Sequence, residues 1–235
     1  EGLVLGRDHA ADATGGVFKA DNAGINFTQV FDKYGAASIG AIAVSQSNPD
    51  VLYIGTGDAS EPDDAQNAQN LAGKLLRLTP DGEVPPDNPR PRSPVFLTGV
   101  RNTQGFDWRD RDTLVLTDHG PSGERFRSGH DEVSLVRAGG NAGWPTIWGC
   151  RASPGMTSPM LSWSDANPPG GAAIYTGEAI PEWRGDLLIG MLGSKHLHRV
   201  SFDANAPGRV RAHEVYLQGD APAGYGRLRE VVMGP

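Results

Sequence analysis

Two short polar stretches contain the side chains best suited to chemistry, and the first lies between two glycines. Arg101, Asn102 and Gln104 place one cation and two amides within four residues, flanked by Gly99 and Gly105. Arginine forms paired hydrogen bonds with carboxylates, and amides bond to quinone or hydroxyl oxygens. The stretch therefore suits an acidic, oxygen-rich ligand, although local composition alone favours a plain polar loop between strands.

The second stretch, residues 117–121, follows one predicted strand later and ends in Gly120 and Pro121. Because proline has no N–H and glycine tolerates positive φ, this pair predicts a tight turn that can direct bare carbonyls at a hard cation such as Ca²⁺. Residues 58–70 form an acidic loop that also carries oxygen ligands. Its spacing fits no EF-hand loop, so a solvated loop is favoured there.

The composition excludes several classes of protein. The chain has 235 residues and a net charge of −7, which argues against a nucleic-acid surface and against binding to an anionic membrane. Cys150 is the single cysteine, so no intramolecular disulfide can form. No apolar stretch approaches the ~20 residues of a transmembrane helix. No basic-then-apolar leader opens the sequence, and Glu1 fits a mature or trimmed start.

The chain is expected to be all-β. Its 32 Gly and 18 Pro, together with Asn and Asp, separate short apolar runs that we interpret as about sixteen or seventeen strands. Propeller blades have four strands in ~40–45 residues, which predicts one β-propeller domain, residues 1–235, of about five four-stranded antiparallel blades. Residues 39–44 and 114–117 are expected to be inner strands. A sandwich or lectin-like barrel is the structural alternative.

Two family resemblances divide this predicted domain. Residues 1–55, with "GGVFKADNAGINFTQVFD" followed by "SNPDVLYIGTGD", resemble a sortilin-like (BNR-type) propeller blade. That resemblance implies a blade and no chemistry. Residues 56–235 form the second part of the predicted domain, and there the matching words belong to another family.

From about residue 52 to the C-terminus, the chain resembles the soluble pyrroloquinoline-quinone (PQQ) sugar dehydrogenases, the glucose/sorbosone or aldose sugar dehydrogenase family. The matching words are "GKLLRLTPDGEVPPDNP", "GVRNTQGFDW", "TDHGPSG…DEVSLV", "GGNAGWP", "AIYTGEAIPEWRGDLLIG" and "YGRLREVVMGP". The resemblance implies a six-bladed propeller that holds PQQ in its central mouth, with Ca²⁺ bridging cofactor and protein. It also implies oxidation of aldose sugars to lactones with an electron acceptor, in the periplasm or outside the cell.

The resemblance carries site residues over by position. Its cofactor-facing residues are Arg101, Asn102, Gln104, His119, Trp163, Asp165, Lys195, Arg227 and Arg229. Its calcium ligands are the carbonyls of Gly120 and Pro121. Strand alternation would send Arg227 and Arg229 to one face, where they could clamp carboxylates. The alternatives are a surface ion-pair face for these two arginines and a packed core aromatic for Trp163.

The sequence departs from the family at the catalytic base. Relatives carry a histidine in an inner strand at the place of residues 36–44, and this chain has none there. His119 is the one replacement candidate inside a matched motif, with Arg101 assisting, although a hydrogen bond to PQQ is its favoured role. The other histidines are poor substitutes by position: His9, His130, His196, His198 and His213.

Two further departures concern a lysine and the ends. Direct alignment puts Gly193 at the family's cofactor lysine, and Lys195 lies two residues later. The first family blades are missing, and the chain stops before the usual last strand. A natural recombination, a chimera and an imperfect sequence would each give this pattern.

Three functions compete. The first is a PQQ- and Ca²⁺-dependent sugar dehydrogenase, intact or impaired. The second is a non-catalytic propeller that binds a ligand, glycan or protein, or a scaffold of recombined blades. The third is a glycoside hydrolase, which needs two carboxylates ~5–9.5 Å apart on facing loops. The sequence marks no such pair.

Overall fold

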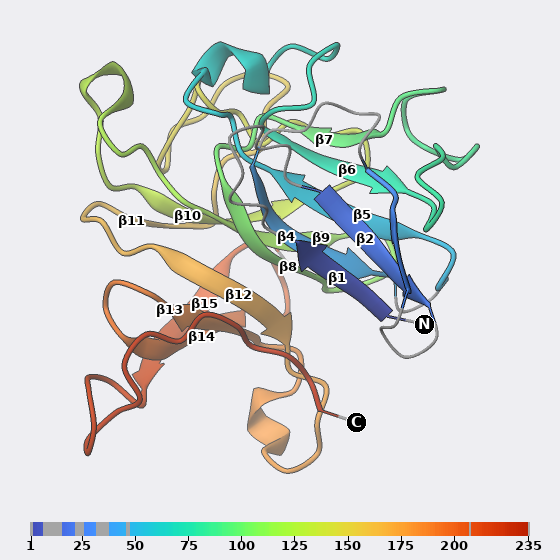
Figure 1. Ribbon diagram of the computed structural model, residues 1–235. Helices are drawn as coiled ribbons and strands as arrows, with labels where there is room; N and C mark the ends of the chain where they lie inside the picture. The colour runs from blue at the N-terminus through green and yellow to red at the C-terminus, as the bar shows by residue number, and fades with distance from the viewer. Residues whose placement is uncertain are drawn as a thin grey trace.

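The computed structural model describes residues 2–6, 16–21, 26–31, 38–45, 48–206 and 208–234. Among these residues the regular structure is almost entirely β, in three four-stranded sheets and one three-stranded sheet (Figure 1). Three short 3₁₀ helices lie in connections within the described part of the chain: Pro62–Ala65, Glu124–Phe126 and Pro181–Trp183. The predicted all-β class is confirmed.

Each four-stranded sheet is a blade in which every strand pairs antiparallel with the next. The first blade contains β4 (Ile39–Val44), β5 (Leu52–Thr56), β6 (Lys74–Leu78) and β7 (Val95–Thr98). The second contains β8 (Thr103–Trp108), β9 (Leu114–Asp118), β10 (Asp131–Val136) and β11 (Leu161–Trp163). The third contains β12 (Pro169–Ile174), β13 (Leu187–Met191), β14 (His196–Phe202) and β15 (Val210–Tyr216). The predicted four-stranded antiparallel blades are confirmed.

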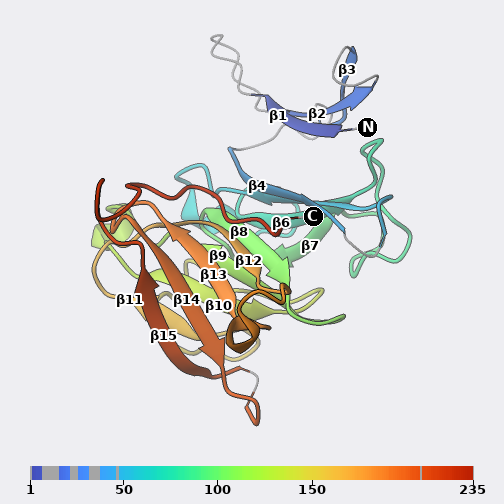
Figure 2. The same ribbon diagram turned by 90° about the horizontal axis from the view of Figure 1, so that it is seen from below.

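The three-stranded sheet contains β1 (Gly2–Gly6), β2 (Gly16–Asp21) and β3 (Asn26–Gln29). It lies beside β4 in Figure 2, and its Val17 shares a buried apolar cluster with Ile54 and Leu76 of the first blade. The stretch that resembles a sortilin-like blade is thus divided between two sheets. Its last strand, β5, pairs with β6, which lies beyond the end of this stretch at residue 55.

The innermost strands are β4, β8 and β12, which face one another at the centre (Figure 2). Glycines permit this approach, because a Cβ built on Gly105 would lie 2.6 Å from the backbone nitrogen of Ala172. The expectation for residues 39–44 is therefore correct. The expectation for 114–117 is wrong, since these residues belong to β9, the second strand of its blade. Val115 and Leu116 are fully buried on both faces of β9, and that run of apolar residues does not distinguish a first from a second strand.

Apolar clusters between neighbouring blades hold the three blades together. Leu75 of the first blade packs with Phe106 and Leu116 of the second, while Val133 of the second packs with Ile189 of the third. Each such side chain contributes about 1.5–3 kcal/mol when fully buried. This packing holds each blade in place relative to its neighbour. It therefore also sets the positions of the loops at the ends of the strands.

The C-terminal segment differs from the expectation. The expected strand would place Arg227 and Arg229 on one face, but residues 228–233 form no strand. The segment instead runs along the third blade, where Gly171 N–H donates to Arg229 O at 2.8 Å and Leu228 N–H donates to Met191 O at 3.4 Å. Too few such bonds form to make a ladder. None of the described helices has the length and apolarity to cross a membrane.

Candidate functional site

Three buried or half-buried carboxylates anchor the loops that carry the predicted site. Asp118, at the end of β9, accepts the backbone N–H groups of Arg101 at 2.8 Å and Asn102 at 2.6 Å. Asp131, at the start of β10, accepts Gly120 N–H at 3.0 Å. Glu132 accepts the N–H of Gly149. Because carboxylates bind backbone N–H groups strongly, these contacts fix the positions of both predicted stretches.

The first and second predicted stretches meet in one hydrogen-bond chain. Gln104 Nε2 donates to Asn102 Oδ1 at 2.8 Å, and Asn102 Nδ2 lies 3.4 Å from His119 Nδ1. His119 Nε2 lies 2.6 Å from the carbonyl oxygen of Pro169. A carbonyl can only accept, so Nε2 carries the proton and Nδ1 is the acceptor. The tertiary structure therefore brings Asn102, Gln104 and His119 together.

His119 is poorly suited to act as a base in this arrangement. Its Nε2–H is directed at Pro169, and its Nδ1 lone pair faces the Asn102 amide. Burial lowers the pKa of His119 below its usual value, although the hydrogen bond to Pro169 opposes this shift. A neutral imidazole with both nitrogens engaged has the properties of a hydrogen-bonding, orienting group.

Arg101 is already paired with a carboxylate. Its guanidinium lies 2.6 Å from Glu124 Oε1 and also contacts the carbonyl oxygen of His119 at 3.3 Å. Burial raises the pKa of Glu124, but the hydrogen bonds and charge of Arg101 together with backbone N–H groups at Ser122 and Glu124 outweigh this effect and lower the pKa. An incoming ligand carboxylate would have to compete with Glu124 for this cation.

Gly120 and Pro121 are buried at the turn after β9. Their carbonyl oxygens accept no hydrogen bond from the part of the chain that the structure describes. A Cβ on Gly120 would lie 1.9 Å from the carbonyl oxygen of Gly129, so only glycine fits under this loop. Two unused carbonyls on a fixed turn are suitable ligands for Ca²⁺. No cluster of three or more His, Cys, Asp or Glu side chains arranged for a metal occurs among the described residues.

A mouth pocket of about 470 Å³ brings together residues from β11, the loop after it and the turn after β13. Its lining residues are Ser162, Trp163, Ser164, Asp165, Ala166, Asn167, Gly193 and Ser194. Three buried polar atoms in this lining have no partner among the described residues: Ser162 Oγ, Asn167 Oδ1 and Ser194 Oγ. Buried polar atoms are rarely left unpaired, so the pocket is suited to a polar ligand.

The predicted lysine does not line the mouth pocket. Lys195 forms an ion pair with Asp220 at 2.7 Å and is not among the residues that line the pocket. Gly193, at the directly aligned position, does line the pocket. The structure thus places Trp163 and Asp165 with Gly193 rather than with Lys195.

Arg227 and Arg229 are exposed, and their guanidinium groups form no hydrogen bond or ion pair with the described residues. The neighbouring Glu230 reaches a central cavity of about 110 Å³, which Gln104 also lines. Burial raises the pKa of Glu230. The C-terminal segment therefore meets the first predicted stretch at the centre of the blades.

The inner strand at the family's base position has no histidine in the structure either. Ser38 and β4 (Ile39–Val44) are described, whereas Ala36 and Ala37 lie outside the described residues, as does His9. Gly40 occupies the place nearest the first stretch, and a Cβ there would lie 2.7 Å from Gln104 Nε2. No described residue supplies a base on this strand.

Sequence reasoning missed several residues of the site. Asp118 and Asp131 lie inside the matched words, so their positions beside the motifs were a usable signal. Glu124 carried no such signal. Glu230 lies inside the last matched word, but its approach to the central cavity joins segments far apart in the chain and could not be read from that word. The three unpaired polar atoms of the mouth pocket likewise become visible only when β11 and the β13–β14 turn are brought together.

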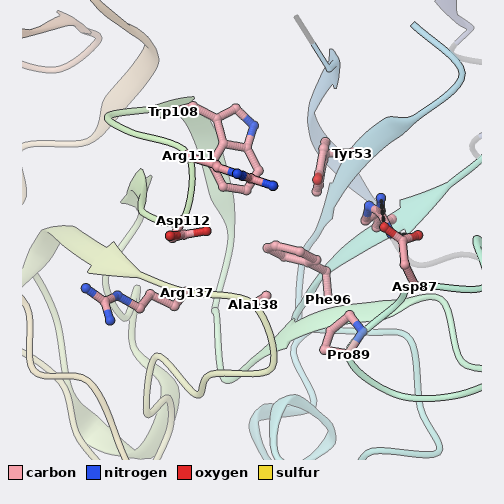
Figure 3. A pocket seen from close by; sticks show the side chains of 10 residues that line it. Tyr53, Asp87, Pro89, Phe96, Trp108, Arg111, Asp112, Arg137 and Ala138 are labelled. Atoms are coloured by element: carbon pink, nitrogen blue, oxygen red, sulfur yellow. Dashed lines mark hydrogen bonds and ion pairs between the residues drawn. The ribbon is translucent and has the colours of Figure 1, made fainter. Parts of the chain in front are cut away.

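A second pocket, of about 360 Å³, is lined by residues of the first and second blades (Figure 3). It includes Trp108, which ends β8, whereas the first predicted stretch lies at the start of that strand. Tyr53, Phe96 and Trp108 form its aromatic wall, with Tyr53 in edge-to-face contact with Phe96 at 5.1 Å and with Trp108 at 5.5 Å between ring centroids. Arg77 and Asp87 form an ion pair at 2.7 Å beside Tyr53. None of the predicted site residues lines this pocket.

Comparison with known proteins agrees with this picture. Residues 14–235 match the family model described as Glucose / Sorbosone dehydrogenase. Aldose sugar dehydrogenase YliI of Escherichia coli is 32% identical over 206 residues, which cover 78% of this chain and 51% of that protein. The chain therefore spans about half the length of this curated relative. The family match begins inside the stretch that resembles a sortilin-like blade.

Solved structures share the fold. A Thermus thermophilus oxidoreductase described as a glucose dehydrogenase has a TM-score of 0.79 and 33% identity, covering 99% of this chain and 70% of its own. The PQQ-bound form of aldose sugar dehydrogenase from Streptomyces coelicolor has a TM-score of 0.73 and 29% identity, covering 97% and 68%. Because the family model matches nearly the whole chain and the blades superpose on such relatives, this chain belongs to the glucose/sorbosone dehydrogenase family of soluble PQQ-dependent sugar dehydrogenases.

Proposed function

We propose that this chain binds PQQ and Ca²⁺ and takes part in the oxidation of aldose sugars to lactones, with an electron acceptor as second partner. The observation that carries the proposal is the mouth pocket, where three unpaired buried polar atoms lie beside Trp163. Its volume falls within the ~300–1,000 Å³ usual for small-molecule sites. The sugar dehydrogenase activity of the relatives and a periplasmic or secreted location are proposed for this chain on the same family basis.

The residues present fit this cofactor. Unused carbonyls at Gly120 and Pro121 suit the calcium ion, and the unpaired Ser162 and Ser194 hydroxyls suit quinone or carboxylate oxygens. Arg227 and Arg229 have no recorded carboxylate partner in the described chain, so they are better placed than Arg101 to bind anionic groups. PQQ, when bound, accepts the hydride equivalent from the sugar.

The chain's own residues would orient the cofactor rather than activate the sugar. Asn102 and Gln104 present amides at the centre, and His119 holds the Asn102 amide in one orientation through its Nδ1. Trp163 and Asp165 form the wall of the mouth pocket. Lys195, held by Asp220, would act only if the β13–β14 turn rearranged.

A non-catalytic binding propeller is the second candidate. The supporting observation is that His119 has both nitrogens engaged and that β4 carries no histidine. A positioned general base contributes ~10²–10⁴-fold to the rate. We therefore expect cofactor binding to exceed catalysis, with slow aldose oxidation or none.

Titration of the purified protein with PQQ, with and without Ca²⁺, tests the proposal. We expect saturable PQQ binding that requires Ca²⁺, followed by little or no dye reduction by aldoses. Two neutral carbonyls bind calcium weakly, so Ca²⁺ alone should not bind tightly at this turn. Absence of PQQ binding at saturating Ca²⁺ would refute the proposed function. Turnover of tens per second would instead show that a base has been overlooked.

A further inference from the structure

Three histidines form a hydrogen-bonded chain in the third blade, outside the site described above. His196 Nε2 lies 3.1 Å from His198 Nδ1, and His198 Nε2 lies 3.2 Å from His213 Nδ1. His196 and His198 are 4% and 2% exposed, whereas His213 is exposed on the edge strand β15. The three hydrogen-bonded histidines thus run from the surface into the interior of the blade.

The protons in this chain have one consistent arrangement when all three rings are neutral. His196 Nδ1 lies 3.3 Å from the carbonyl oxygen of Ser194, which can only accept, so this nitrogen carries the proton. His196 Nε2 then accepts from His198 Nδ1–H, and His198 Nε2 accepts from His213 Nδ1–H. The Nε2 of His213 remains free to take a proton from solvent. A second proton on His198 would sit on Nε2 and face the Nδ1–H of His213, so this link of the histidine chain would break.

His198 also contacts a residue of the neighbouring blade. Its ring meets Trp163 of β11 edge-to-face, with 5.2 Å between centroids and an interplanar angle of 84°. Trp163 is half-buried, on a strand of three residues, and lines the mouth pocket. Such a short edge strand gives little support to the indole by itself, so the contact from β14 helps to define its orientation.

We propose that His198 is a positioning residue for Trp163. The imidazole chain fixes the His198 ring, and His198 in turn holds the Trp163 indole in the wall of the mouth pocket. The proposed consequence for a cofactor rests on the proposed function, but the positioning of Trp163 does not. Acid that protonates His198 breaks the chain and releases the indole.

The surroundings of His198 support this acid sensitivity. The titratable groups that face it are His196 on its own strand and His213 on β15, while Ile189 of β13 and Trp163 of β11 are apolar. Arg211, two residues before His213, adds a positive charge on β15, where it contacts Ser201. Burial, followed by the charges of His196 and His213, lowers the pKa of His198 to about 4 from its usual value of 6.5.

The experiment follows Trp163 directly. The Trp163 signal is obtained by subtracting the near-ultraviolet circular dichroism and acrylamide quenching of Trp163→Phe from those of the unsubstituted protein, between pH 3.5 and 7.5. We expect a change in the Trp163 signal with a midpoint near pH 4, where His198 titrates, ahead of any loss of far-ultraviolet signal. A Trp163 signal that stays constant over this range would overturn the proposal.

Variants of the exposed His213 separate positioning from general loss of structure. His213→Ala removes the donor to His198 Nε2, so quenching of Trp163 at pH 7 should rise and the midpoint should move up by about one unit or more. His213→Asn keeps an N–H donor and should restore the behaviour of the unsubstituted protein. His130→Ala, which is not one of the three hydrogen-bonded histidines, should change neither the quenching nor the midpoint. Equal Trp163 signals and midpoints in all variants would overturn the proposal. Failure to bind PQQ would refute only the proposed function.

Discussion

Replacing Asp118 by asparagine tests how the site loops are anchored. The side chain is 6% exposed, and each of its oxygens accepts one backbone N–H, from Arg101 or Asn102. Asparagine keeps the shape but offers one oxygen and one NH₂ group. One backbone N–H is therefore left facing a donor, which costs about 1–3 kcal/mol.

The size of this effect should depend on pH. Burial raises the pKa of Asp118 from 3.8 to about 7, although the two backbone hydrogen bonds and the Arg101 charge oppose the rise. At a pH between these two pKa values, Asp118 keeps its proton in the folded protein and has lost it in the unfolded chain. The contribution of Asp118 to the free energy of unfolding is therefore present at low pH and is lost as the pH rises to about 7. At 1.36 kcal/mol for each unit of pKa difference, the loss amounts to about 4 kcal/mol.

Asp118→Asn has no such titration. The variant should therefore be less stable than the unsubstituted protein at pH 4.5, and the difference should shrink or reverse by pH 8.5. Urea unfolding, followed by circular dichroism at several pH values, gives the free energy of unfolding for both proteins. Most other titrating groups contribute to both proteins and largely cancel in the difference. Glu132 does not cancel fully, because burial and then the Asp118 charge raise its pKa, and removing that charge adds to the same trend with pH.

Asp110→Asn is the matched control. Burial raises the pKa of Asp110, but hydrogen bonds from the backbone of Asp112 and from Thr113 outweigh this effect and lower it. Its stability difference should therefore be flat between pH 5 and 8.5. If the Asp118→Asn difference were constant, or grew with pH, the buried carboxyl would not titrate as argued here.

Three further outcomes are expected. Arg229→Ala should weaken PQQ binding about tenfold, and calorimetry that shows the same affinity as the exposed control Arg209→Ala would remove the arginine from the site. His119→Gln should retain PQQ binding within about threefold, because glutamine also hydrogen-bonds; a large loss of turnover alone would identify His119 as the base. Gly105→Ala should lower the free energy of unfolding by about 1–3 kcal/mol through its clash with β12, whereas Gly208→Ala, with open space around it, should change it by under about 0.5 kcal/mol.

Local sequence patterns were sufficient for most strands. The apolar runs at β5, β6, β10 and β13 alternate with turns rich in Gly, Pro, Asn and Asp, and each forms a strand. These signals depend on neighbouring residues, whose side chains alternate between faces whatever the rest of the chain does. β11 was missed, because three residues give too short a pattern.

The sequence by itself determined the family, the all-β class and the two stretches that meet at His119, because these depend on residue order and local turn chemistry. The tertiary structure decided which strand is innermost, that Arg101 is paired with Glu124, and that Gly193 rather than Lys195 lines the mouth pocket. It also brought His198 of one blade against Trp163 of another. Each of these depends on how blades pack side by side, and contacts between segments dozens of residues apart leave no periodic trace in a single sequence.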